Sequence, residues 1–184
     1  MENPISKSIL FLLCVPTLFQ LAYSLDIVQQ SCKLAAQTDP YVNYKLCVQS
    51  LKANPNYSKD ANFKDLVMIS INQAMGNATE IGSGISDLLK GSSEKWGKYS
   101  LNCLKSCLEI YSEAVSDLEK ALGALKMEDY GTAHAGLSAA MDAPMSCEDG
   151  YKEKDGEVSP LTEINDGFFQ LIAISLAFIN MFVN

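Results

Sequence analysis

The sequence predicts an all-α protein built as an up-down-up-down four-helix bundle, and two observations carry this prediction. From Leu101 to Leu125, large apolar residues recur at alternating intervals of three and four, with polar residues between them. That is the spacing of one buried stripe on an α-helix, and a helix of this length needs partner helices to cover its stripe. The second observation is that no segment alternates with the period of two that is typical of a half-buried strand.

The two helices nearest the N-terminus are expected to be short and to form a hairpin. They are predicted over residues 26–37 and 41–51, with a turn signal at Pro40 between them. Cys32 and Cys47 lie at similar distances on either side of this turn, so two antiparallel helices would bring them level. A bridge between them would close a loop of about 16 residues, which is worth roughly 3 kcal/mol when unfolded-chain entropy is counted.

Four long helices are expected after a polar linker. The first is predicted over residues 63–88, where apolar residues again recur at intervals of three and four. Its three glycines, Gly76, Gly82 and Gly84, are expected to mark a kink or a close helix crossing, because glycine otherwise weakens a helix. The second long helix carries the stripe described above.

The third long helix is expected to begin near Asp129, and Pro144 is expected to kink or interrupt it. The last should begin at Ser159-Pro160, an N-cap followed by proline at the first helical position. The stretch from residue 167 to 183 is apolar enough to raise the question of a membrane anchor, but polar residues interrupt it. We expect it to be the buried final helix of the bundle.

The first 24 residues predict a secretory signal peptide. Lys7 precedes an apolar run, and Ala22-Tyr23-Ser24 places small residues at the two positions that a signal peptidase reads. A membrane anchor is the alternative, but the run is too short to span a bilayer comfortably. Residues 25–184 then form one domain with its own core, divided into a hairpin over 26–53 and a bundle over 60–184.

Five cysteines remain once the signal, which contains Cys14, is removed. They are Cys32, Cys47, Cys103, Cys107 and Cys147. In an oxidising compartment they predict two disulfides and one free thiol. Cys107 lies close enough to the apolar stripe of its helix to face a neighbouring helix. The sequons at Asn56, in a loop, and Asn77, inside a predicted helix, also fit an exported glycoprotein.

The charge of the chain limits its partners. It carries 14 basic residues, all of them lysine, against 22 acidic ones, for a net charge of −8. Nucleic-acid binding is not expected, because phosphate contacts need a basic face. A basic protein partner would suit this charge better, although a solvated acidic surface explains it as well.

The sequence does not predict an enzyme. Its single histidine, His134, lies on the third predicted long helix, where a catalytic Ser-His or Cys-His site would have to use it. Cys103 and Cys107, four residues apart, are a weak metal-binding signal without a histidine beside them. No motif for zinc, for a nucleophile elbow or for phosphate binding is complete. We therefore expect no cofactor, no metal and no catalytic residue.

Motifs built around the cysteines recur along the chain from residue 32 onward. Cys32 is followed by Pro40-Tyr41-x-x-Tyr44-x-x-Cys47-x-x-x-Leu51, and the later helices contain Cys107-Leu-Glu-Ile-Tyr111 and Ser146-Cys-Glu-Asp-Gly-Tyr151. In combination these motifs resemble the plant invertase and pectin methylesterase inhibitor family. The stretch from Cys147 to Pro160 is similar to a pollen-type, allergen-like subgroup of its invertase inhibitors.

The resemblance implies a four-helix bundle with a projecting N-terminal hairpin and the disulfides Cys32–Cys47 and Cys107–Cys147. Cys103 is then a free thiol that the family pattern lacks. The resemblance also implies a secreted protein of the apoplast and cell wall, or of the vacuole, with no membrane attachment after signal removal. Such a protein would occlude the active-site cleft of a carbohydrate-active enzyme, an invertase or a pectin methylesterase. The alternative is a non-inhibitory bundle that binds another protein or a small apolar ligand.

One segment departs from the family pattern. The family's invertase inhibitors carry a Pro-Lys-Phe motif before the third bundle helix, and this motif inserts into the invertase site. The matching positions here are Glu128, Asp129 and Tyr130, so the aromatic residue is kept while the proline and lysine are replaced by acids. Because these residues open a helix and are expected to be exposed, we interpret them as candidate partner contacts.

Overall fold

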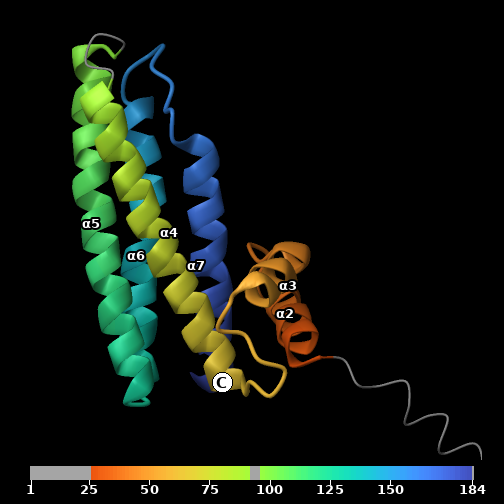
Figure 1. Cartoon of the computed structure of the whole chain (residues 1–184). Helices are drawn as coiled ribbons and strands as arrows, with labels where there is room; N and C mark the ends of the chain where they lie inside the picture. The colour runs from red at the N-terminus through yellow and green to blue at the C-terminus, as the bar shows by residue number, and fades with distance from the viewer. Residues whose placement is uncertain (1–25, 92–95, 184) are drawn as a thin grey trace, which may run out of the picture.

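The computed structural model describes residues 26–91 and 96–183, and all regular structure in this part of the chain is helical. The helices are α2 (Ile27–Thr38), α3 (Tyr44–Ala53), α4 (Phe63–Gly91), α5 (Lys98–Lys126), α6 (Tyr130–Lys152) and α7 (Thr162–Val183). The four long helices, α4 to α7, run alternately up and down (Figure 1), which confirms the predicted four-helix bundle. The predicted signal peptide lies outside the described residues.

The stripe of α5 forms the centre of the core, although its position on the helix differs from the prediction. Four of its predicted members are fully buried: Leu104, Tyr111, Leu118 and Leu125. Between them the buried positions are the small residues Cys107, Ala114, Ala121 and Ala124. Leu108, one of the large apolar residues of the predicted stripe, is only half-buried. The stripe is therefore turned toward the helix with which α5 makes its closest approach.

That helix is α6, against which α5 packs most extensively. An added Cβ at Gly136 of α6 would lie 2.8 Å from the carbonyl oxygen of Asp117 and 3.1 Å from the Cβ of Ala121. The two helices thus approach too closely at this point for any side chain larger than hydrogen. The expectation of a close crossing at the α4 glycines is wrong, since an added Cβ at any of the three would meet nothing closer than 3.7 Å.

α6 continues through Pro144, which was expected to kink or interrupt it. Proline in a helix interior removes a hydrogen bond and costs about 3 kcal/mol. The Cys107–Cys147 disulfide, with a Cα–Cα distance of 5.1 Å, ties the part of α6 beyond the proline to α5. Tyr151 packs one turn further on and is 1% exposed. These tertiary contacts hold the end of α6 in helical form.

α7 is the most apolar helix of the bundle. It begins at Thr162 rather than at Pro160, and the Ser159 hydroxyl accepts a hydrogen bond from the N–H of Leu161 (3.1 Å) in the turn before it. Among the described residues, α7 alone is long and apolar enough to cross a membrane, and half of this apolar stretch is buried within the protein. Its buried residues run from Asn165 to Ile179, so α7 packs as the final bundle helix.

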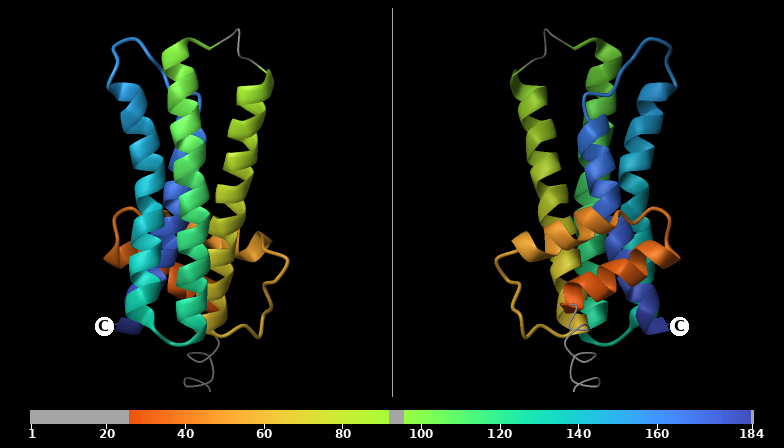
Figure 2. Two further views of the ribbon diagram at one scale, coloured as in Figure 1. Left: turned by 90° about the vertical axis from the view of Figure 1, so that its left-hand side faces the viewer. Right: turned by 90° about the vertical axis from the view of Figure 1, so that its right-hand side faces the viewer.

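α2 and α3 form the hairpin, which lies beside the lower half of the bundle against α4 and α7 (Figure 2). The Cys32–Cys47 disulfide joins them with a Cα–Cα distance of 5.7 Å, and both cysteines are fully buried. The other buried apolar residues of the hairpin are few: Val28, Ala35, Val42 and Leu51. The Gln73 amide of α4 donates a hydrogen bond to the carbonyl of Ser50 (2.7 Å) and fastens the hairpin to the bundle.

Asp26 is the polar centre of the hairpin. Its carboxylate caps α2 by accepting a hydrogen bond from the N–H of Val28 (3.1 Å). It also lies 2.8 Å from the Lys52 ammonium at the end of α3, and it accepts a hydrogen bond from the Tyr57 hydroxyl (2.9 Å). The hydrogen bond from Lys52 holds the pKa of Asp26 below its usual value. One carboxylate therefore joins α2, α3 and the linker that follows.

Candidate functional site

The α5–α6 turn, Met127–Tyr130, contains the three predicted contact residues and lies at the lower end of the bundle (Figure 1). Two backbone hydrogen bonds close it. The N–H of Glu128 donates to the carbonyl of Leu125 (3.1 Å), and the N–H of Asp129 donates to that of Ala124 (3.0 Å). These are the two bonds of a Schellman motif, in which a helix ends through a left-handed residue. The connection is therefore a defined turn rather than a loose loop.

Glu128 occupies the left-handed position of this motif, with φ of 62°. Glycine is usual there, and a residue with a Cβ costs about 1–2 kcal/mol. The Glu128 carboxylate lies 2.9 Å from the Lys64 ammonium of α4, an ion pair whose acidic side chain is 67% exposed. Exposed pairs of this kind contribute about 1 kcal/mol at most. A strained glutamate that keeps its carboxylate in solvent is a candidate functional residue.

Asp129 is the N-cap of α6. Its carboxylate accepts hydrogen bonds from the N–H of Thr132 (3.0 Å) and from the Thr132 hydroxyl (2.7 Å). These bonds hold the pKa of Asp129 below its usual value. The carboxylate is thus ionised at neutral pH, where it also interacts favourably with the helix dipole. Asp129 is exposed as expected, but its side chain already has a structural role.

Tyr130 is half-buried, so the expectation that all three residues are exposed is wrong for this one. Its ring stacks on Phe182 of α7, with centroids 4.6 Å apart and an interplanar angle of 7°. Phe182 in turn contacts Phe63 at the start of α4, with centroids 5.1 Å apart. This aromatic cluster joins α4, α6 and α7 beneath the turn. Tyr130 supports the turn from inside instead of offering its ring to a partner.

Met127 is the residue of this site that sequence analysis missed. It is 77% exposed, between the end of α5 and the strained Glu128. Leu125 is the last fully buried member of the apolar stripe. The position of Met127 beyond the end of the stripe is the sequence feature that could have indicated its exposure. The turn therefore presents one flexible apolar side chain with two carboxylates beside it. Met is well suited to irregular apolar pockets because its thioether chain adapts to their shape.

A second acidic surface lies between α6 and α7. It is a groove of about 280 Å³ whose lining includes Met145, Glu148 and Asp166. The Glu148 carboxylate accepts hydrogen bonds from Thr162 (2.9 Å) and from the amide of Asn165. Glu148 thus joins α6 to α7. Because Glu148 is already engaged within the bundle, this groove is a weaker candidate for a partner contact than the α5–α6 turn.

The cysteines are paired as the resemblance implied, Cys32 with Cys47 and Cys107 with Cys147. Cys103 is free and half-buried, and its thiol lies 3.5 Å from the carbonyl oxygen of Gly150. Burial raises the pKa of the Cys103 thiol. Since the thiolate is the reactive form, this cysteine is not activated as a nucleophile.

His134 lies on α6 and is half-buried. Its Nδ1 is 3.4 Å from the Ser138 hydroxyl, one helical turn further on. Residues four apart on a helix are ordinary neighbours, so this contact needs no catalytic explanation. No cluster of three or more potential metal ligands occurs among the described residues.

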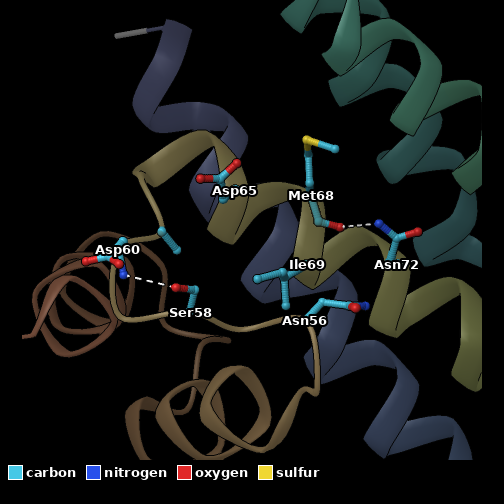
Figure 3. A pocket seen from close by; sticks show the side chains of 8 residues that line it. Asn56, Ser58, Asp60, Asp65, Met68, Ile69 and Asn72 are labelled. Atoms are coloured by element: carbon cyan, nitrogen blue, oxygen red, sulfur yellow. Dashed lines mark hydrogen bonds between the residues drawn. The ribbon is translucent and has the colours of Figure 1, made fainter.

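The two predicted glycosylation sites differ in their surroundings. Asn56 is exposed in the linker between α3 and α4, beside a groove of about 380 Å³ that the linker forms with α4 (Figure 3). Asn77 lies in the middle of α4, and its side-chain oxygen is buried without a hydrogen-bond partner.

This chain belongs to the plant invertase/pectin methylesterase inhibitor family, whose sequence profile matches residues 26–178. The matched range contains the hairpin, the α5–α6 turn and most of α7.

Two relatives are named as inhibitors of the two different enzymes. A protein of Platanus acerifolia named "Putative invertase inhibitor" is 42% identical over 160 residues, which cover 87% of each chain. "Pectinesterase inhibitor 12" of Arabidopsis thaliana is 37% identical over 155 residues, covering 84% of this chain and 87% of the relative. The crystal structure of a mutant form of a pectin methylesterase inhibitor from Arabidopsis has the same fold, with a TM-score of 0.68 at 21% identity. That alignment covers 82% of this chain and 95% of the other.

Proposed function

We propose that this protein is an inhibitor of a carbohydrate-active enzyme, an invertase or a pectin methylesterase, and that it acts by binding the enzyme. The observation that carries the proposal is the family match over residues 26–178, with relatives named for both kinds of inhibition. The bundle supports a binding role because two disulfides and one continuous core give it a preorganised surface.

We further propose that the inhibitor is secreted and meets its target in the apoplast and cell wall, or in the vacuole. The predicted signal peptide supports this location. Disulfides also form and persist in oxidising compartments, which fits the two bridges of the domain.

The contact that we propose is the α5–α6 turn, with Met127 as its apolar anchor and Glu128 as its charged partner. The turn is closed by backbone hydrogen bonds and supported by the Tyr130 ring, so little ordering entropy is lost on binding. A proline at position 128, as in the Pro-Lys-Phe motif, could not adopt a φ of 62°. The turn therefore needs a target cleft with an apolar pocket for Met127 and a basic rim for Glu128. Such a cleft differs from one that accepts the lysine of the Pro-Lys-Phe motif.

The test is residual activity of a purified acid invertase and a purified pectin methylesterase at rising concentrations of the mature protein. We expect near-stoichiometric inhibition of one of them, weakened by salt because exposed charges are screened within about 10 Å at 0.1 M. Met127→Glu should weaken inhibition about tenfold or more, as expected for an interface anchor worth about 1.4 kcal/mol or more.

The matched control is Met145→Glu, because Met145 is also an exposed methionine, at 44%, but lies in the α6–α7 groove. It should leave inhibition unchanged. If neither enzyme loses activity at micromolar concentrations of protein that is folded by circular dichroism, the inhibitor proposal fails. The alternative of a non-inhibitory bundle that binds another protein or a small apolar ligand would then take its place.

A further inference from the structure

We propose that Asn56 carries an N-linked glycan whose first N-acetylglucosamine packs into the groove between the linker and α4, and that Asn77 stays unmodified. The inference requires that the chain enters the secretory pathway, but it does not depend on which enzyme the protein inhibits. Figure 3 shows the groove, with Asn56 on the linker side and Met68, Ile69 and Asn72 on α4.

The backbone distinguishes the two sequons. Asn56 and Ser58 are both exposed on a segment without helix, where the N–H of Asn56 donates to the side chain of Asn54 (2.9 Å). Asn77 is held within a 29-residue helix, with its Oδ1 buried. A sugar on the amide nitrogen of Asn77 would sit next to that buried oxygen, so the whole amide would have to leave its place. Asn56 can carry the modification with no such change.

The groove has the chemistry of a sugar site. Met68 and Ile69 supply an apolar floor, with Ile69 only 6% exposed, and one face of a pyranose ring is apolar enough to cover them. Asp60 and Asp65 line the groove and can accept hydrogen bonds from sugar hydroxyls. The two carboxylates would repel an anion, which favours a neutral, hydroxyl-rich occupant. At about 380 Å³ the groove is at the small end of the range for ligand sites.

Attachment at Asn56 explains how a shallow groove could hold a sugar. A tethered group is present at an effective concentration in the millimolar range or above, so a weak fit suffices. In the transfer step the Asn56 amide nitrogen bonds to the anomeric carbon of a lipid-diphosphate-linked oligosaccharide. The bond from that carbon to the diphosphate oxygen breaks, the lipid diphosphate leaves, and the amide loses one proton. The attached sugar would then cover the linker between residues 54 and 62.

The first experiment locates the glycan. The full chain, with its own signal, is expressed in insect or plant cells and recovered from the medium for intact-mass measurement. We expect a single N-glycan on the wild type and on Asn77→Gln, and none on Asn56→Gln. Secreted protein without carbohydrate at Asn56, or with carbohydrate at Asn77, would overturn the proposal.

The second experiment tests the position of the first sugar. An endoglycosidase trims the glycan to one N-acetylglucosamine, and trypsin cleavage after Lys59, which is exposed in the linker, is compared with that of Asn56→Gln. We expect the trimmed protein to be cleaved several-fold more slowly at Lys59 and equally fast at Lys154, the control in the α6–α7 loop. Introducing Met68→Ser, at a half-buried position, should remove the protection while the circular dichroism spectrum stays unchanged. Equal cleavage of the trimmed protein and Asn56→Gln at Lys59 would rule out the packed sugar.

Discussion

The hairpin and the α5–α6 pair are both antiparallel helix pairs closed by one disulfide, but different forces hold them. In the hairpin the fully buried bridge is accompanied by few apolar residues and by a carboxylate that joins α2, α3 and the linker. In the α5–α6 pair, large buried side chains alternate with alanine, and Gly136 permits the closest approach. A cross-link thus substitutes for a core in the first pair and only reinforces one in the second.

Removing each disulfide in turn should have the largest effect on the stability of the two helix pairs. In the chain-entropy view, the double variant Cys107→Ala, Cys147→Ala should lose about 4 kcal/mol of unfolding free energy, and Cys32→Ala, Cys47→Ala about 3 kcal/mol. The two losses should differ in kind. In the Cys32→Ala, Cys47→Ala variant, hydrogen exchange should show that the hairpin amides lose protection. The bundle amides of the same variant should keep their protection, because core packing holds the bundle. Equal protection of both regions in that variant would mean that the hairpin has a sufficient core.

Core truncation should confirm the shifted stripe of α5. Leu118 is fully buried, so Leu118→Ala should cost about 2–5 kcal/mol in denaturant unfolding. Leu108 is half-buried at the edge of the stripe, and Leu108→Ala should cost about half as much or less. If the two variants lose the same free energy, the stripe is centred on the large residues after all.

Two glycine-to-alanine substitutions should change the stability of the protein in opposite directions. Gly136→Ala places a Cβ against the Asp117 carbonyl, and the overpacking should cost about 1–3 kcal/mol. Gly76→Ala meets nothing within 4 Å in the middle of α4, so it should stabilise the protein by about 0.5–1 kcal/mol. Thermal melts of both variants provide the measurement. A stable Gly136→Ala protein would show that the α5–α6 distance can relax.

Acid should loosen the hairpin through Asp26. Because the folded pKa of Asp26 lies below its usual value, its contribution is present above that value and is lost as the pH falls through the folded pKa. With 30% of the Asp26 side chain and 39% of the Lys52 side chain exposed, solvent screens the ion pair, so its contribution to stability is small. Hairpin amide protection should therefore fall modestly as the pH drops below about 4, the usual pKa of an aspartate. Asp26→Asn, which keeps a cap, should remove that dependence; an unchanged acid response in this variant would exclude Asp26 as its cause.

Sequence periodicity was sufficient for the helices because it records which face of each helix is apolar. It placed half of the α5 stripe one residue too far along the chain because large side chains dominate the pattern, whereas the buried positions there are small residues such as Ala114 and Ala121. The interruption predicted at Pro144 is absent because a disulfide and Tyr151 hold the helix beyond it. These are tertiary effects, and local propensity contains no information about them.

The candidate site was only partly accessible to sequence reasoning. Family resemblance indicated positions 128–130, but the stacking of Tyr130 on Phe182 joins residues far apart in the chain. The left-handed φ of Glu128 could not be foreseen, because glycine is the usual residue at that position. Met127 became a candidate only through its exposure.

The most direct test of the account is oxidative footprinting of the protein in complex with an enzyme that it inhibits. Met127 is 77% exposed at the proposed contact, and Met145, at 44%, reports on the other acidic surface of the same molecule. Oxidation by hydroxyl radicals is followed by peptide mass spectrometry for the free protein and for the complex. The account predicts that oxidation of Met127 slows several-fold on binding while that of Met145 is unchanged. Inhibition of the enzyme with Met127 oxidised at its free rate would contradict the proposed contact at the α5–α6 turn.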